Sequence, residues 1–124
     1  MEVRDALIAA AREFNQGQYF EAHEALEEAL DDVPDEQWEL FLGLIQISVG
    51  YHKITQGLFS GAARMLHIGL AKVDPLPGNF AGVHLAALRE RAHADLEALE
   101  TRTFDAESFR RTPPRLQPRP LRPN

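Results

Sequence analysis

The chain of 124 residues contains no cysteine. It therefore cannot build a disulfide framework or a thiolate zinc site, and thiol catalysis is excluded. Its longest apolar stretch, residues 40–51, is too short to span a membrane and contains Gln46. The first residues are charged rather than apolar, so we expect no signal peptide. These absences predict a soluble, cytoplasmic protein that needs neither disulfides nor metal merely to fold.

Basic side chains are scarce outside the C-terminal end. The formal net charge of the whole chain is −6. Five arginines and no acidic residue lie within Arg110–Asn124, so the preceding residues carry a balance of −11. A body with that much negative charge repels nucleic acid. We therefore expect neither a nucleic-acid partner nor a membrane association.

No stretch alternates polar and apolar residues convincingly, so the sequence predicts no β-strand. Apolar residues recur instead at helical spacing, which predicts five helices over about residues 3–14, 18–32, 35–56, 60–73 and 83–101. The third helix is apolar on nearly every side between Leu40 and His52, as a buried central helix is. Short links between helices favour antiparallel neighbours. The predicted fold is all-α: a single-domain bundle of about five helices in antiparallel hairpins around the buried third helix.

The predicted helical domain covers residues 1–104. Residues 105–124 differ in composition, because they are rich in proline and arginine. From Thr112 onward, five of thirteen residues are proline. Such a segment cannot bury enough apolar surface to offset its ordering entropy. The sequence therefore predicts a largely disordered C-terminal tail.

The second helix contains a candidate site. His23 and Glu27 are four residues apart, so they share one face of the helix. An imidazole nitrogen and a carboxylate oxygen on adjacent turns can bind one divalent cation, most naturally zinc, manganese or iron. A third ligand must come from another helix. If the chain reverses at residues 34–35, Gln46 is the expected neighbour, and His52 is a second helper almost two turns further along.

The same residues admit other interpretations. His23, Glu27 and Gln46 can form a satisfied polar network that holds helices in register. The protein is then a helical interaction module, acting through an exposed groove or a face that binds a second copy or another protein. A general acid–base role is chemically open as well. However, the chain has no nucleophile elbow and no phosphate-binding glycine loop, so whether it is an enzyme stays undecided.

Three stretches carry a family resemblance. Residues 14–27 read Phe-Asn-x-Gly-x-Tyr-Phe-Glu-Ala-His-Glu-x-Leu-Glu, residues 43–52 contain Gly-Leu-Ile-Gln and then Tyr-His, and residues 61–66 read Gly-Ala-x-x-Met-Leu. Together they resemble the domain-of-unknown-function 309 family, small helical proteins of bacteria and archaea. The family motif is His-x-x-x-Glu-x-x followed by Trp or Tyr. His23 and Glu27 match it, whereas Leu30 stands at the aromatic position. The resemblance implies a prokaryotic helical protein with a candidate metal site and no established activity.

Overall fold

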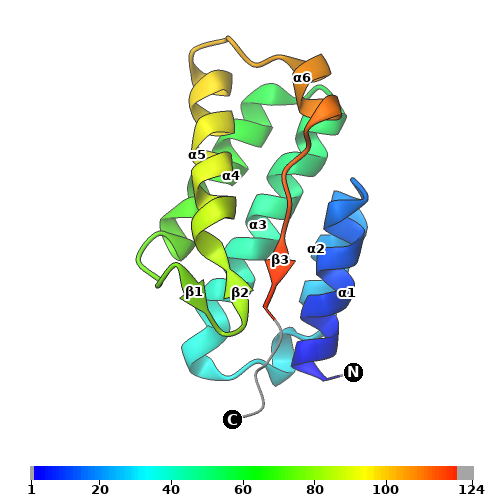
Figure 1. The fold of residues 1–124 in the computed structure, drawn as a ribbon, viewed down its shortest axis with the longest axis vertical. Helices are drawn as coiled ribbons and strands as arrows, with labels where there is room; N and C mark the ends of the chain where they lie inside the picture. The colour runs from blue at the N-terminus through cyan, green and yellow to red at the C-terminus, as the bar shows by residue number, and fades with distance from the viewer. Residues whose placement is uncertain (1, 120–124) are drawn as a thin grey trace.

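The computed structural model describes residues 2–119. Its α-helices are α1 (Val3–Asn15), α2 (Tyr19–Glu28), α3 (Trp38–Thr55), α4 (Phe59–Val73), α5 (Leu85–Glu100) and α6 (Ala106–Arg111). Two 3₁₀ helices, η1 (Leu30–Asp32) and η2 (Asp35–Gln37), connect α2 to α3. In Figure 1 the helices α1 to α5 run up and down the long axis, with α1 on one side and α5 on the other. The predicted all-α fold class is confirmed.

Helix α3 is the centre of the bundle, as its composition predicts. Ten of its eighteen residues are buried, against α2 on one side and α4 on the other. Leu40, Ile47 and Tyr51 are fully inaccessible. Burial of its apolar side chains is the main driving force that holds the hairpins together. No helix within residues 2–119 combines the length and apolar character that crossing a membrane requires.

Two glycines reverse the chain in the same way. Gly17 after α1 and Gly57 after α3 have φ of +80° and +74°, which a residue with a side chain rarely adopts. At each turn, the glycine and the following residue donate their backbone N–H groups to carbonyls of the last helical turn. This is the Schellman arrangement, which satisfies the last carbonyls of a helix. Both turns allow the next helix to begin two residues later and pack antiparallel.

The structure adds a small antiparallel sheet that the sequence does not predict. Its strands are β1 (Asn79–Phe80), β2 (Val83–His84) and β3 (Gln117–Pro118), in the order β1-β2-β3. Each strand has two residues, so no alternating pattern can build up in the sequence. The sheet joins the link before α5 to the C-terminal segment.

The structure places residues 105–119 of the expected disordered tail against the bundle. Residues 106–111 form α6, and Phe109 and Leu116 are 7% and 1% exposed. In Figure 1 this segment descends across the face of the bundle between α5 and α1. Composition does not predict this docking, because a few well-spaced anchors suffice to dock a segment onto a body that is already folded. Residues 120–124 of the predicted tail lie outside the described residues.

Candidate functional site

The candidate site lies where α2 packs against α3. Two ring contacts set the register of these helices: Tyr19 lies 5.6 Å from Tyr51, and Phe20 lies 5.2 Å from His52, measured between ring centroids. Tyr19 is buried, whereas Phe20 is 43% exposed. Helix α2 therefore directs one aromatic ring into the core and the next onto the surface, because adjacent helical residues point about 100° apart.

His23 is held in one orientation. Its Nδ1 atom lies 2.5 Å from the carbonyl oxygen of Phe20, and its ring contacts the Phe20 ring at 4.8 Å. A carbonyl can only accept, so Nδ1 carries a proton, and in the neutral imidazole the lone pair is on Nε2. Nε2 lies 3.8 Å from Oε1 of Glu27, and the two side chains are 14% and 58% exposed. The predicted i, i+4 pair therefore exists, with the imidazole mostly covered and the carboxylate in water.

His52 belongs to the same surface. It contacts Phe20, so this one ring is flanked by His23 and His52. A shallow hollow of about 430 Å³ lies beside it, lined by residues of the α1–α2 turn, of the first turn of α2 and of α3: Gly17, Gln18, Tyr19, Phe20, Glu21, His52 and Thr55. Five of these residues belong to the 14–27 stretch that carries the family resemblance. Phe20 therefore contacts both His23 and His52, and Glu27 reaches this surface through its pairing with His23.

Gln46 is not brought to this surface. It lies three residues after Gly43 and four before Gly50, and a Cβ at either glycine would touch α4. Residues at these spacings share a helix face, so Gln46 lies along the flank of α3 that meets α4. His52, six residues further, points about 120° away from it. The Oε1 atom of Gln46 is buried without a hydrogen-bond partner in the described part of the chain.

The donor set limits what the site can do. Among residues 2–119, no group of three or more His, Asp or Glu side chains is close enough to enclose a metal ion. A cation bound by His23 and Glu27 therefore has two protein ligands and completes its coordination with water or with an atom of a ligand or partner. Leu30, at the family's aromatic position, is half-buried and packs against the core, so it supplies no polar group.

A second polar cluster, buried at the bundle centre, was missed by sequence reasoning. The Tyr51 hydroxyl donates to Oδ2 of Asp95 at 2.7 Å, and Nε of Arg91 donates to the same oxygen at 2.9 Å. Asp95 is 8% exposed. The sequence did contain a signal. Asp95 lies three residues after Ala92 and four before Leu99, so it interrupts the apolar face of α5.

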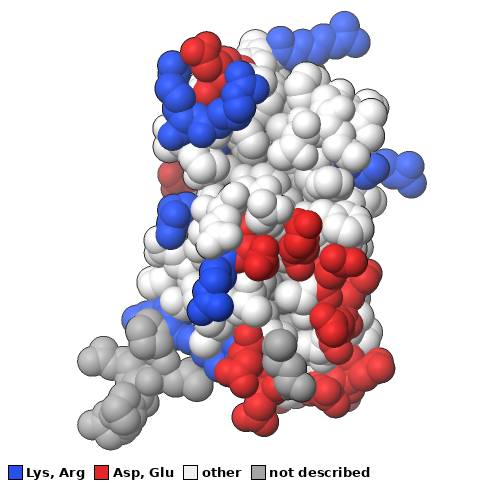
Figure 2. Space-filling view, turned by 90° about the vertical axis from the view of Figure 1, so that its right-hand side faces the viewer, with Lys and Arg blue, Asp and Glu red and all other residues white. Residues whose placement is uncertain are grey.

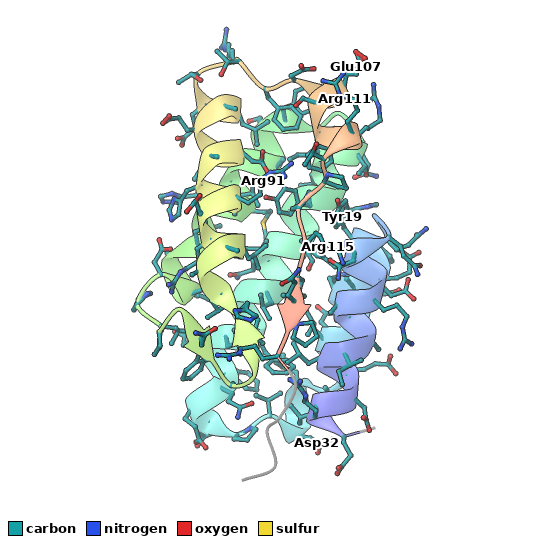
Figure 3. The ribbon with its side chains drawn as sticks, in the orientation of Figure 1. Tyr19, Asp32, Arg91, Glu107, Arg111 and Arg115 are labelled. Carbon is teal, nitrogen blue, oxygen red and sulfur yellow. The ribbon has the colours of Figure 1, made fainter. Side chains whose placement is uncertain are left out.

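The aromatic surroundings of this cluster suppress ionisation of both tyrosines. Burial raises the pKa of Tyr19 to about 12; Arg91 opposes this shift and Asp95 adds to it. Burial, with Asp95 close by, raises the pKa of Tyr51 well above 10.0. Phe109 stacks on Tyr51 at 5.8 Å, and the Arg91 guanidinium lies 5.8 Å from the centre of the Phe109 ring. Figure 3 labels Arg91 on the α5 side of the bundle and Tyr19 on the side of α1 and α2.

These two clusters differ in chemical character. In the buried cluster, Asp95 has two donors and Tyr51 is held neutral, so it is a paired network that positions α5 against α3. The surface cluster has an imidazole lone pair and an exposed carboxylate, which are free to bind something from solution. A ligand therefore has its best opportunity at the surface cluster.

Fold and site together define a small helical protein with a histidine–carboxylate pair on its second helix and an aromatic, aspartate-centred core. The family model described as Domain of unknown function (DUF309) matches residues 7–65. The matched region begins within α1, contains α2 and α3 with the His23–Glu27 pair and His52, and ends within α4. The resemblance to this family of uncharacterised proteins is confirmed. No curated protein matches the chain.

Proposed function

We propose that the protein binds a divalent cation, such as zinc, manganese or iron, through Nε2 of His23 and the carboxylate of Glu27. One observation carries the proposal. The Phe20 carbonyl accepts a hydrogen bond from Nδ1–H of His23, so Nε2 is the ring nitrogen that faces the carboxylate one turn away. A second hydrogen bond that sets the tautomer and orientation of the ring is the usual support of a histidine metal ligand.

The spacing of the two donors also supports this role. At 3.8 Å, Nε2 and Oε1 are too far apart for a hydrogen bond between them. Two ligands of a tetrahedral zinc ion, each about 2.1 Å from the metal, lie about 3.4 Å apart. The Glu27 side chain is more than half exposed, so it can move a few tenths of an ångström at small cost. Water or an external ligand would supply the remaining coordination.

We propose that His52 contacts a molecule bound beside the ion and does not coordinate the ion itself. It lines the hollow beside Phe20, where a molecule that coordinates the ion could contact it. We leave Gln46 out of the site because it lies on the α4 flank of α3. The proposal places the protein in the cytoplasm, which its lack of cysteine supports, and assigns no reaction to it.

A protein-interaction module is the second candidate, and the exposure of Phe20 favours it. A large aromatic side chain that is 43% exposed, flanked by two histidines, resembles the aromatic anchors of protein interfaces. In this case the His23–Glu27 pair orients Phe20, and the partner is a second copy or another protein.

The deciding measurement is metal binding by tag-free protein purified without chelator, using elemental mass spectrometry and calorimetric titration with zinc, manganese and iron(II). We expect one equivalent of bound metal in the wild type. Its affinity should fall at least roughly tenfold in His23→Ala and in Glu27→Gln. The matched control is His93→Ala, because His93 forms another exposed histidine–carboxylate pair, with Asp74 at 3.0 Å.

Loss of metal from His23→Ala but not from His93→Ala would support the site on α2. Absence of bound metal in the wild type would overturn it, and so would equal loss from both histidine variants. In that case Phe20→Ala tests the second candidate. It should abolish self-association, or capture of a partner, without affecting the fold.

A further inference from the structure

Residues 105–119 lie on the bundle in the way a peptide ligand lies on its receptor. Only Phe109, Pro114 and Leu116 of these fifteen residues are buried, and most of the others face solvent. A segment of a folded core is usually covered on more sides than this. Widely spaced anchors joined by exposed residues are typical of linear peptides in grooves.

The first anchor, Phe109, fills an aromatic pocket made by the helices. Its ring lies 5.8 Å from Tyr51, 6.4 Å from Tyr19 and 5.6 Å from Phe104. Arg91 approaches the same ring at 5.8 Å, a cation–π distance. The pocket recognises an aromatic side chain by shape, by stacking and by charge.

The second anchor, Leu116, is recognised through its backbone. The Asn15 side-chain amide donates to the Leu116 carbonyl at 3.0 Å, and the Leu116 N–H donates to the Asn15 side-chain oxygen at 2.8 Å. One side chain thus pairs with both backbone groups, as a neighbouring strand would. Beyond it, β3 pairs with β2, and Arg4 donates to the carbonyl of Arg119. Backbone pairing of this kind accepts many sequences with the right anchors.

The segment is basic, and one side of the bundle is acidic. The segment has four exposed or half-exposed arginines: Arg110, Arg111, Arg115 and Arg119. Figure 2 shows acidic side chains gathered on the lower part of the side formed by α1 and α2. Attraction to this acidic side would speed the approach of a basic peptide to the protein.

One wall of the groove lies within the matched family region, whereas the α5 wall and the occupant lie outside it. Asn15, Tyr19 and Tyr51 all fall within residues 7–65. The segment that fills the groove begins forty residues later. It is joined to α5 by a short link that begins with Arg102, whose φ of +59° forms the left-handed cap of α5: the N–H groups of Arg102 and Thr103 donate to carbonyls of the last turn of that helix.

We propose that the groove between α1 and α5 is a peptide-binding site, which the chain's own residues 105–119 occupy in cis. The partner is a segment of another protein with the same chemistry: an aromatic residue, then a basic, proline-containing stretch, then a leucine seven residues after the aromatic one. The cis segment blocks the site until the partner competes it away. The short link gives that segment an effective concentration in the millimolar range, so the partner must bind more tightly than the free segment does.

The test uses the full chain and a fluorescent peptide with the sequence of residues 105–119, followed by fluorescence anisotropy. In the variant Phe109→Ala/Leu116→Ala, the cis segment loses two anchors while the groove keeps its walls. We expect this variant to bind the peptide at least tenfold more tightly than the wild type does. Adding Asn15→Ala should reverse most of that gain. A peptide with alanine in place of its Phe and Leu is the negative control.

A variant that keeps its helical circular dichroism but does not bind the peptide would overturn the proposal. So would a dimer of the variant that excess peptide cannot dissociate, since it would assign the groove to a second copy. Hydrogen exchange of the wild type provides a test that needs no variant. The Leu116 amide should exchange at least tenfold faster than the amides of α3. Equal protection would mean that the segment opens only when the whole protein unfolds, which contradicts competition for the groove.

Discussion

At the scale of single residues, the structure depends on how buried charge is compensated. Asp95 is almost inaccessible, and an unpaired carboxylate at such a position would cost several kcal/mol. Tyr51 and Arg91 both donate to one of its oxygens. A hydrogen bond to a charged group contributes about 1.5–3 kcal/mol. The network therefore requires a tyrosine at position 51, where phenylalanine would fill the same space without donating.

The raised pKa values of the tyrosines predict loss of stability in alkali. The unfolded chain loses its phenol protons near pH 10.0, whereas folded Tyr19 keeps its proton to about pH 12 and the pKa of folded Tyr51 is raised well above 10.0. The stability is therefore fully present below pH 10.0 and declines as the pH rises toward the folded pKa values. Each tyrosine contributes a slope of about −1.4 kcal/mol per pH unit. Urea unfolding at several alkaline pH values measures this slope.

The two tyrosines are the only ones in the chain, so phenolate absorbance reports them without background from others. Tyr19→Phe and Tyr51→Phe should each make the slope shallower by about 1.4 kcal/mol per pH unit, which is the contribution of one tyrosine. A slope that stays unchanged in both variants, or phenolate absorbance that appears near pH 10.0 in the folded protein, would contradict the raised pKa values.

Sequence reasoning at this scale succeeded for local pairs and failed for distant ones. His23 and Glu27 are a pair because of helix geometry alone, so their spacing was sufficient to predict them. Asp95 and Tyr51 are 44 positions apart, and their contact depends on where α5 docks. The assignment of Gln46 used a register counted from the turn, without the rotation of α3 about its own axis. That rotation is set by the glycine contacts with α4.

At the scale of helices, the crossing of α3 and α4 depends on small residues. A Cβ at Gly69 would lie 2.8 Å from the Gly43 carbonyl oxygen and 3.0 Å from the Ile47 backbone nitrogen. Both atoms belong to the backbone of α3, so neither can move unless the whole helix does. Each glycine costs up to about 1 kcal/mol of helix propensity against alanine. The close approach that it permits must stabilise the crossing by more than that.

Gly69→Ala should therefore destabilise the protein by about 2–3 kcal/mol, because overpacking at a backbone contact outweighs the gain in helix propensity. Gly61→Ala, in the same helix, is the matched control. There an added Cβ meets only the side chain of Lys53 at 3.1 Å, which can move aside, so the variant should be neutral or slightly more stable. Thermal and urea unfolding compare the two. Equal effects in both variants would mean that the α3–α4 crossing tolerates a methyl group.

The helices themselves were predictable because several independent signals agreed on them. Apolar periodicity marked their faces, and Gly17 and Gly57 marked their ends. The small sheet had no such redundancy, since strands of two residues leave no periodic signal. It forms because α1, the link before α5 and the C-terminal segment meet at one end of the bundle.

At the scale of the whole molecule, the bundle is closed by a segment whose composition indicates disorder. Arginine and proline are the commonest residues of 105–119, yet Leu116 is 1% exposed and held by Asn15. Composition describes what a segment can do alone. It cannot describe docking onto a surface that the rest of the chain has already ordered. The most that the segment can add to the free energy of unfolding is its own docking free energy. Once that is lost, the segment opens while the helices stay folded.

The docking free energy therefore limits how much stability can be lost when the anchor Leu116 is replaced by alanine. A Leu→Ala change in a rigid core costs about 2–5 kcal/mol, but a segment that opens locally cannot lose more than its own docking free energy. Leu116→Ala should therefore lower the free energy of unfolding by about 2 kcal/mol, at the low end of that range. Arg115→Ala, one residue earlier and exposed, should change it by less than about 0.5 kcal/mol. Urea unfolding of both variants measures the difference.

If Leu116→Ala matched Arg115→Ala, the segment would lie free of the bundle in solution. A loss near 5 kcal/mol would make it an inseparable part of the core, and the groove could not then open to a partner while the helices remain folded.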